Sequence, residues 1–188
     1  MKMRVMKIRM MKMSPDPDPH TDPSPTERDV QMMSRAIALA DEAANLGEVP
    51  VGAVVYDTTS GKVLGEAHNT REMHKNPAGH AEFSAIVQAC ESIDDWRLNH
   101  CTLVVTLEPC PMCAGLIVNA RVGRLVFGAS DPKAGAVRTL YRLCEDPQLN
   151  HRCEVIAGIK ADQCSEQLST FFRTLRKKPT RSTDSESH

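Results

Sequence analysis

The sequence predicts an α/β protein with one mixed β-sheet and helices on both of its faces. Segments with helical spacing of apolar residues alternate with short apolar runs, after an initial pair of strands joined by a turn. The chain has 188 residues, of which 41% are hydrophobic, so it can build one substantial core. Charged residues make up 25% and the formal net charge is −1, which excludes fibrous and wholly disordered classes.

The first elements are a helix and a β-hairpin. The helix is expected over residues 27–45, because Thr26 and Asp29 have the spacing of a capping box and apolar residues then recur at steps of three and four. Apolar or alternating runs at residues 49–56 and 63–67 flank a short turn-forming segment, which is typical of a β-hairpin. This hairpin begins the sheet.

The rest of the sheet comes from strands separated by helices. A polar loop, a helix, a buried strand, a second helix and two more strands are expected, in that order, over residues 69–79, 81–91, 101–106, 111–119, 124–127 and 154–159. Residues 161–177 form a closing amphipathic helix, whose apolar face carries Cys164, Leu168, Phe171, Phe172 and Leu175. With the hairpin, these runs predict five strands.

Both ends of the chain have compositions that cannot form a core. Residues 1–26 are expected to be a disordered N-terminal extension, since a basic, methionine-rich stretch is followed by one rich in proline and aspartate. Residues 179–188 are polar and are expected to be a disordered tail. The folded domain is therefore expected over residues 27–178.

The composition also bears on location and partners. No apolar run reaches the roughly 20 residues of a membrane-spanning helix, and no apolar region of a secretory signal follows the basic N-terminus, so we expect a cytoplasmic protein without a membrane partner. Seven cysteines, an odd number, favour metal ligation over a disulfide scaffold. The C-terminal end is basic, which indicates a solvated helix face or a phosphate-binding patch built from Arg173, Arg176, Lys177, Lys178 and Arg181.

Four residues have the pattern of a catalytic zinc site: His80, Glu82, Cys110 and Cys113. The two cysteines lie three apart at the start of a predicted helix, where their side chains project from nearly the same face and the thiolate form is favoured. His80 opens the preceding predicted helix and is a third ligand of a type that zinc accepts. Three protein ligands leave one position for water, whereas a structural zinc is closed by four.

Glu82 supplies a proton carrier for that water. It lies two residues after His80, so both side chains can approach one ion only at the start of a helix. A carboxylate there can accept a proton from an activated water and deliver it to a leaving amine, so the predicted chemistry is hydrolytic. Two other interpretations stay open at this point. One is a redox-active cysteine pair, and the other is a structural zinc closed by His68, His74, Cys90 or Cys101.

The motifs His-Ala-Glu at residues 80–82 and Pro-Cys-Pro-Met-Cys at residues 109–113 resemble those of the cytidine-deaminase-like zinc deaminases. Over residues 28–177 the chain is similar to one group among them, the bacterial tRNA-specific adenosine deaminases. The segments that carry this similarity are Glu48–Val54, Asn69, Thr106–Cys110, Cys113–Gly115, Gly123–Arg124, Val126–Ala129, Asp131, Asn150–Arg152 and Phe171–Arg173.

The resemblance implies a three-layer α-β-α cytidine-deaminase-like fold with a mixed five-stranded sheet. It implies a homodimer that binds the tRNA anticodon stem-loop and converts adenosine to inosine at the wobble, or first anticodon, position. One Zn²⁺ per subunit is implied, with Glu82 as the catalytic proton shuttle, Asn69 bonded to the flipped-out base and Asp131 beside the nucleotide backbone. The implied zinc ligands are His80, Cys110 and Cys113.

Several positions depart from the family's pattern, among them Phe83, Thr70–Arg71 and two longer segments. Asn76–Gly79 precedes His80 where the family has Asp-Pro-Thr-Ala, and Ala136–Thr139 replaces a run of small residues. Neither includes an expected zinc ligand, but both bear on RNA-binding loops and hence on which tRNA is bound. Two alternative functions remain: a deaminase of free guanine, cytosine or a nucleoside on the same fold, and a non-catalytic zinc-containing module that binds RNA.

Overall fold

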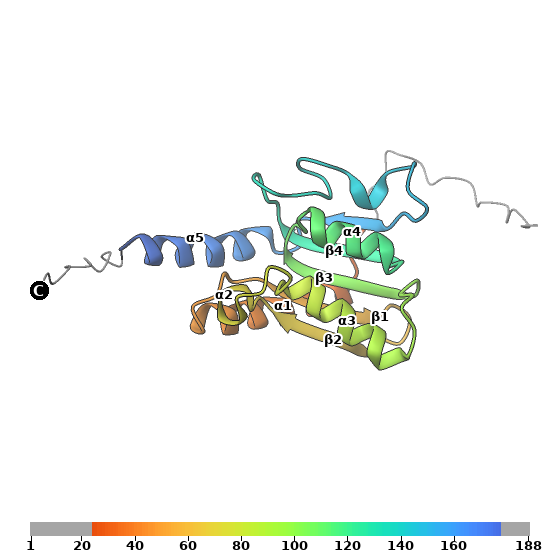
Figure 1. Ribbon diagram of the computed structural model, residues 1–188, viewed down its shortest axis with the longest axis horizontal. Coiled ribbons are helices and arrows are strands. Elements are labelled where there is room, and N and C mark those ends of the chain that lie inside the picture. The colour runs from red at the N-terminus through yellow and green to blue at the C-terminus, as the bar shows by residue number, and fades with distance from the viewer. Residues whose placement is uncertain (1–23, 178–188) are drawn as a thin grey trace, which may run out of the picture.

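The computed structural model describes residues 24–177, which form a five-stranded sheet in the order β2-β1-β3-β4-β5 (Figure 1). β1 pairs antiparallel with both β2 and β3, whereas β3, β4 and β5 run parallel. The strands are β1 (Gly52–Asp57), β2 (Val63–His68), β3 (Cys101–Leu107), β4 (Arg124–Ala129) and β5 (Glu154–Ala157). The helices are α1 (Glu27–Asn45), α2 (Arg71–His74), α3 (Ala81–Ile93), α4 (Pro111–Asn119), α5 (Ala161–Lys177) and the 3₁₀ turn η1 (Leu143–Glu145).

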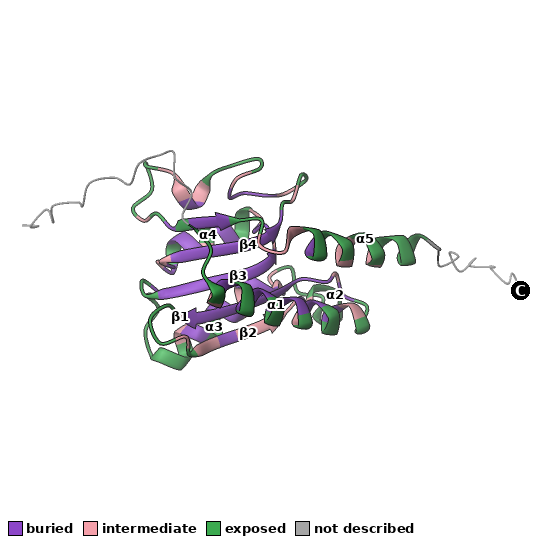
Figure 2. Ribbon diagram, turned by 180° about the vertical axis from the view of Figure 1, so that it is seen from behind, coloured by how far each residue is buried: buried purple, intermediate pink, exposed green. Residues whose placement is uncertain are grey.

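Helices cover both faces of this sheet, which confirms the predicted fold class. α1 and the start of α5 pack on the face that carries Val54, Tyr56 and Val104. α3 and α4 pack on the opposite face, against residues such as Val55 and Leu103. Successive strand residues thus point to alternate layers, as the period of a strand requires. Figure 2 shows the central strands buried between the helices.

The helices predicted to begin at residues 27, 81, 111 and 161 begin at these residues in the structure. Thr26 caps α1 through the expected capping box with Asp29, and α4 has Pro111 as its first residue. Two short elements were not expected: the predicted polar loop at residues 69–79 contains α2, and η1 precedes β5. α2 has no side-chain cap from its own N-cap residue, because the hydroxyl of Thr70 makes no capping hydrogen bond.

α5 differs from the closing amphipathic helix that the sequence predicts. Its first turns pack on the sheet, where Cys164 is buried and lies against Gly128 of β4. Phe172 and Leu175 are 42% and 44% exposed, because the helix continues past the end of the sheet (Figures 1 and 2). As far as the structure describes its side chains, the C-terminal half of α5 therefore exposes both apolar and basic groups to solvent.

The predicted disordered segments fall, apart from residues 24–26, outside the described residues, and so do both basic residues after α5, Lys178 and Arg181. The domain limits 27–178 therefore stay a prediction. Within residues 24–177, no helix is both long enough and apolar enough to cross a bilayer.

Candidate metal centre and substrate pocket

Two helix N-termini meet beside the carboxyl end of β3 and supply the expected metal ligands. Cys110 is the N-cap residue of α4, and Cys113 lies in the first turn of the same helix. His80 is the N-cap residue of α3, and Glu82 is the second residue of that helix. The helix-start location that the His-x-Glu spacing requires is therefore present.

The three ligand atoms are close enough to hold one ion. His80 Nδ1 lies 3.7 Å from Cys110 Sγ and 3.6 Å from Cys113 Sγ, and the three atoms all lie within 4.8 Å of one another. Tetrahedral zinc with bonds of about 2.3 Å to sulfur and about 2.0 Å to nitrogen places its nitrogen and sulfur ligands about 3.5 Å apart. The donor set and its spacing therefore fit zinc.

The thiols of this cluster differ in acidity. The hydrogen bond from Cys113 lowers the pKa of Cys110 to about 3, with a further contribution from His80 and against the opposing effect of burial. The pKa of Cys113 is raised, because this thiol donates to Cys110 and is buried. Cys110 is therefore the more acidic thiol of the pair, and the thiolate is the form in which either cysteine would bind a metal.

No fourth protein ligand joins the cluster among the residues that the structure describes. His80, Cys110 and Cys113 form the group, and the candidate closing ligands His68, His74, Cys90 and Cys101 are not part of it. Glu82 is buried, and burial raises the pKa of its carboxyl group. A raised pKa suits a group that must both accept and release a proton near neutral pH.

The cluster of candidate metal ligands borders a pocket of about 220 Å³. Asn69 enters it from the end of β2 and Asp131 from the loop after β4, so residues far apart in the sequence line one cavity. This volume is below the range of about 300–1,000 Å³ typical of ligand pockets, which suits one planar base better than a whole nucleotide. The lining residues are Val49, Val51, Asn69, Arg71, Glu72, His80, Glu82, Leu107, Glu108, Cys110, Asp131 and Ala134.

Comparison with known proteins agrees with this geometry. A family model described as MafB19-like deaminase matches residues 27–176. A tRNA-specific adenosine deaminase of Bacillus subtilis (strain 168) is 46% identical over 151 residues, which cover 80% of this chain and 92% of that protein. The chain belongs to the tRNA-specific adenosine deaminase family. A member of the family from Haemophilus influenzae is also 46% identical, over 80% of this chain and 87% of its own length.

Solved structures place the fold in the same family. One comes from a study of A-to-I editing by tRNA:A34 deaminases at the wobble position of transfer RNA. It has a TM-score of 0.69 and 38% identity, covering 73% of this chain and 99% of that chain. A guanine deaminase from Nitrosomonas europaea has a TM-score of 0.64 at 23% identity, over 76% of this chain and 83% of that chain, and shows the fold alone.

Two buried glutamates beside the pocket had no role assigned from the sequence. Glu48 accepts hydrogen bonds from Asn69 Nδ2 and from the backbone N–H groups of Glu72 and Met73 at the start of α2. Glu108 bonds to the loop that carries Asp131. The available signal was an acidic residue at the edge of an otherwise apolar run, as in Thr-Leu-Glu-Pro at residues 106–109.

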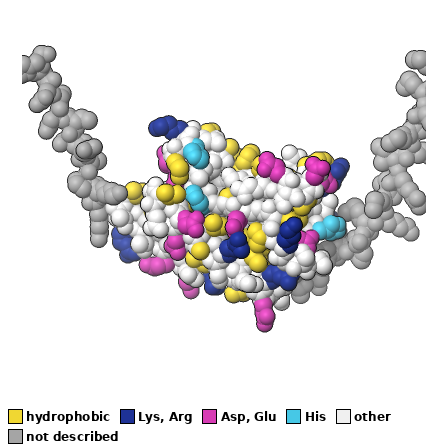
Figure 3. Space-filling model, turned by 90° about the horizontal axis from the view of Figure 1, so that it is seen from below, with side chains coloured by type: hydrophobic (Ala, Val, Ile, Leu, Met, Phe, Trp, Pro, Cys, Tyr) yellow, Lys and Arg dark blue, Asp and Glu magenta, His cyan; other side chains and the backbone are white. Residues whose placement is uncertain are grey.

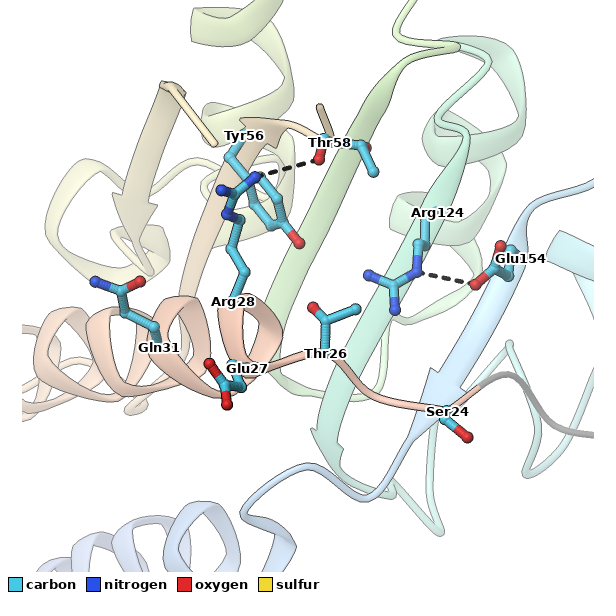
Figure 4. Close-up of a pocket in the computed structure, with 9 residues that line it drawn as sticks. All are labelled: Ser24, Thr26, Glu27, Arg28, Gln31, Tyr56, Thr58, Arg124 and Glu154. Carbon is cyan, nitrogen blue, oxygen red and sulfur yellow. Dashed lines mark hydrogen bonds and ion pairs between the residues drawn. The ribbon is translucent and has the colours of Figure 1, made fainter. Parts of the chain in front are cut away.

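A larger cleft, of about 920 Å³, lies at the other end of the strands (Figure 4). Arg124 and Arg28 are its basic groups. Arg124 is paired with Asp29 and Glu154, and Arg28 donates to the backbone carbonyls of Thr58 and Thr59. Both arginines are thus engaged with other groups, and the metal-ligating cluster found among residues 24–177 lies at the smaller pocket and not at this cleft. Size alone does not identify the functional site.

Proposed function

We propose that this chain hydrolyses adenosine to inosine at the first anticodon position of a tRNA, with Zn²⁺ as cofactor. The observation that carries the proposal is the three-residue ligand set with the buried carboxyl group of Glu82 beside it, in a pocket sized for one base. The relatives named tRNA-specific adenosine deaminase support the substrate class. The overall change is addition of water to the adenine ring and loss of its 6-amino group as ammonia.

The zinc site would be formed by His80, Cys110 and Cys113. A zinc ion bound there would lower the pKa of a water molecule to about 7. Glu82 would take up the proton that this water releases and pass it to the departing amine. The burial that raises the pKa of Glu82 allows the carboxyl group to hold that proton between the two transfers.

Binding of the target nucleotide is assigned to Asn69 and Asp131, which both line the pocket. Asn69 is buried, and its Nδ2 donates to Glu48 Oε2 at 3.0 Å. Because a carboxylate can only accept, this bond fixes which way round the Asn69 amide faces. Asp131 would lie beside the ribose and phosphate of the same nucleotide. A target base must leave the stacked loop to enter so small a cavity.

The RNA backbone is assigned to α5. Arg173 and Arg176 are exposed on its C-terminal half, followed in the sequence by Lys177 and Lys178. On the face seen in Figure 3, by contrast, acidic and basic side chains of the described residues are interspersed. A concentration of positive charge on a projecting helix suits a polyanion and gives no advantage for a free base. This favours tRNA over the guanine- or cytosine-type alternative.

The proposal includes a homodimer in the cytoplasm. A groove of about 470 Å³ between α3 and α4 exposes Val87 and Trp96, and it lies on the two helices whose first turns carry the metal ligands. A second copy of the chain would cover it. The cysteines of the described chain are free thiols, which suits a reducing compartment. Sedimentation of the full chain, with Trp96→Glu as the comparison, tests the pairing.

The deciding experiment is incubation of the zinc-loaded full chain with total tRNA, followed by mapping of inosine at nucleotide resolution. Inosine confined to the first anticodon position supports the proposal. Parallel reactions with free guanine, cytosine, adenosine and cytidine test the alternative, which predicts ammonia from one of these and unchanged tRNA. Retained zinc without ammonia from any substrate would favour the non-catalytic module. Glu82→Ala serves as the matched inactive protein.

A further inference from the structure

Glu108 collects five hydrogen-bond donors from one loop. Its Oε1 accepts from the backbone N–H groups of Val137, Arg138 and Thr139, at 3.2, 2.8 and 2.9 Å. Its Oε2 accepts from the backbone N–H of Asp131 at 3.1 Å and from the hydroxyl of Thr139. Glu108 is only 2% exposed, so this carboxylate is desolvated and satisfied almost entirely by the loop.

The loop is wrapped closely around this side chain. A Cβ atom added at Gly135 would lie 2.4 Å from Glu108 Oε2, so a larger residue there cannot be accommodated without a shift. Ala136 N donates to Pro109 O at 2.9 Å, which ties the middle of the loop to the residue after Glu108. The path of the loop is therefore set by the segment that leads directly to the metal ligand Cys110.

Asp131 is held by two sets of hydrogen bonds, one to its carboxylate and one to its backbone N–H. Its own carboxylate accepts from the backbone N–H groups of Lys133 and Ala134, at 2.9 and 3.2 Å, which is a local turn. Its backbone N–H is bonded to Glu108. The local turn fixes how the Asp131 side chain leaves the loop, whereas Glu108 fixes where the loop stands relative to the pocket.

The departure of residues 136–139 from the family's small-residue run is accommodated by this arrangement. Val137 and Arg138 reach Glu108 through backbone N–H groups, which every non-proline residue has, so these two bonds do not depend on which side chains stand there. The Arg138 side chain in turn pairs with Glu145 at 3.1 Å and donates to Val155 O of β5. The loop is thus fastened from inside by Glu108 and from outside by Arg138.

We propose that Glu108 is a positioning residue for the substrate, which holds the rim loop, residues 131–139, at a fixed distance from the metal ligands. The inference rests on the proposed function and deepens it. Glu108 acts through Asp131 and Ala134, which line the pocket, because β3 and Cys110 give the carboxylate a rigid base. Pre-organised loops bind without the entropy cost of ordering them on substrate arrival.

Glu108→Gln tests this with nearly unchanged shape. A glutamine amide keeps one acceptor oxygen, but its NH₂ group faces groups that themselves donate. The Thr139 hydroxyl can turn and accept a hydrogen bond instead, whereas the backbone N–H of Asp131 can only donate. We expect amide hydrogen exchange in residues 131–139 to accelerate at least tenfold, with β3 unchanged and metal content equal to that of the wild type. KM for an anticodon stem-loop should rise about tenfold, with a smaller fall in kcat.

A double-mutant cycle separates positioning from general stability. If Glu108 acts through the loop, Glu108→Gln should cost little further kcat/KM in an Asp131→Ala background, whereas an additive loss overturns the proposal. Asp29→Asn is the matched control: it changes another buried, multiply bonded carboxylate and should leave loop exchange and KM unchanged. Loss of metal, or a fall in kcat at constant KM, would instead place Glu108 in the metal site and contradict the inference.

Thr139→Val keeps the test decisive if Glu108→Gln does not fold. It removes one hydroxyl donor and leaves the backbone N–H of residue 139 in place. We expect about threefold higher KM and faster exchange confined to the end of the loop. Unchanged values of both overturn the proposal. Loop exchange is measured without substrate, so it tests Glu108 even if the wild type forms no inosine, a result that would refute the proposed function alone.

Discussion

The two ends of the strands both bury carboxylates, yet they use them differently. At the end where β4 and β5 begin, Asp29 of α1 receives both terminal nitrogens of Arg124, at 2.6 and 2.7 Å, and the hydroxyl of Tyr56 at 2.8 Å. Arg124 also binds Glu154. The buried charge of Asp29 is matched by the guanidinium of Arg124, and the network joins α1 to three strands.

At the other end the buried acids form no ion pair with a lysine or arginine among residues 24–177. Glu48 and Glu108 accept from backbone N–H groups, one side-chain amide and one hydroxyl, all belonging to segments that surround the pocket. Burial by itself raises the pKa of Glu108, but the hydrogen bonds from Thr139, Arg138 and Asp131 outweigh it and lower the pKa. For Glu82 the effect of burial outweighs the hydrogen bonds that lower the pKa, so its pKa is raised.

The comparison teaches that a buried carboxylate is defined by its donors. An arginine partner suits a structural joint, a set of loop N–H groups suits a shaped rim, and a buried carboxyl group with a raised pKa beside the ligand cluster suits the proton carrier proposed above. Substitutions at the two ends should therefore have different signatures: loss of stability at the Arg124 end, and loss of catalysis or metal at the Cys110 end.

The largest effect is expected from Glu82→Ala. Removing a positioned general acid and base lowers rates by about 10²- to 10⁴-fold, so kcat for inosine formation should fall by about that factor. Because Glu82 lies outside the ligand cluster, zinc content measured by atomic emission should stay at one per subunit. Activity equal to the wild type would remove Glu82 from the mechanism.

Cys113→Ala should remove the metal and activity together. One ligand of three is lost, so we expect zinc content to drop at least tenfold on dialysis against a weak chelator. Cys90→Ser is the matched control, because Cys90 lies on α3 outside the cluster and should keep zinc. Full zinc occupancy in Cys113→Ala would contradict the assigned ligand set.

Asp29→Asn should destabilise the fold without a selective loss of catalysis. It leaves the guanidinium of Arg124 short of a buried partner, a change that costs about 3 kcal/mol in the free energy of unfolding. Glu154→Gln is the control, because that carboxylate is 48% exposed and its pairing contributes less than about 1 kcal/mol. Urea unfolding measures both, and equal effects would show that burial does not separate the two acids.

Acid should weaken the same joint. Burial by itself raises the pKa of Asp29, but bonds from Arg124, Thr26 and Tyr56 outweigh it and lower the pKa to about 2. Because the folded pKa lies below the unfolded one, this stabilisation is full above about pH 5 and is lost as the pH falls toward 2. It amounts to about 2 kcal/mol. The free energy of unfolding of Asp29→Asn should therefore depend less on pH over this range than that of the wild type.

The smallest effect concerns α5. Neutralising Arg173, Arg176, Lys177 and Lys178 to glutamine should weaken tRNA binding by about tenfold at physiological salt, since each lost phosphate contact lowers the salt slope by about 0.7 to 0.9. Binding measured across a salt series tests this, with Arg97→Gln, which lies between α3 and β3, as the control. An unchanged slope would show that α5 is only a solvated helix.

Local pattern was sufficient for most elements and for the metal set. Apolar spacing and the Thr26 capping box predicted α1, and the position of Pro111 predicted the start of α4. The His-x-Glu and Cys-x-x-Cys spacings predicted a helix-start location for His80 and Cys110, which the structure has. These features depend on residues within one or two turns of each other, so they can be predicted without knowledge of the rest of the fold.

α2, the rim loop and the course of α5 could not be predicted in this way. α2 is capped by Glu48, more than twenty residues earlier, and the loop after β4 is held by Glu108, more than twenty residues before Asp131. α5 has the apolar periodicity of a buried helix, but the sheet ends before its second half, which leaves Phe172 and Leu175 exposed. Periodicity reports which face is apolar and not what covers it.

The sequence by itself determined the α/β class, most of the helices and strands, the candidate metal-ligand residues and the acid beside them, because short-range spacing carries that information. Only the tertiary structure decided that Asn69 and Asp131 line one pocket with the ligands, and that Glu48 and Glu108 shape its walls. The physical reason is that a buried carboxylate must be satisfied by whichever donors the folded chain brings to it. Those donors come from segments whose proximity is set by strand order rather than by sequence distance.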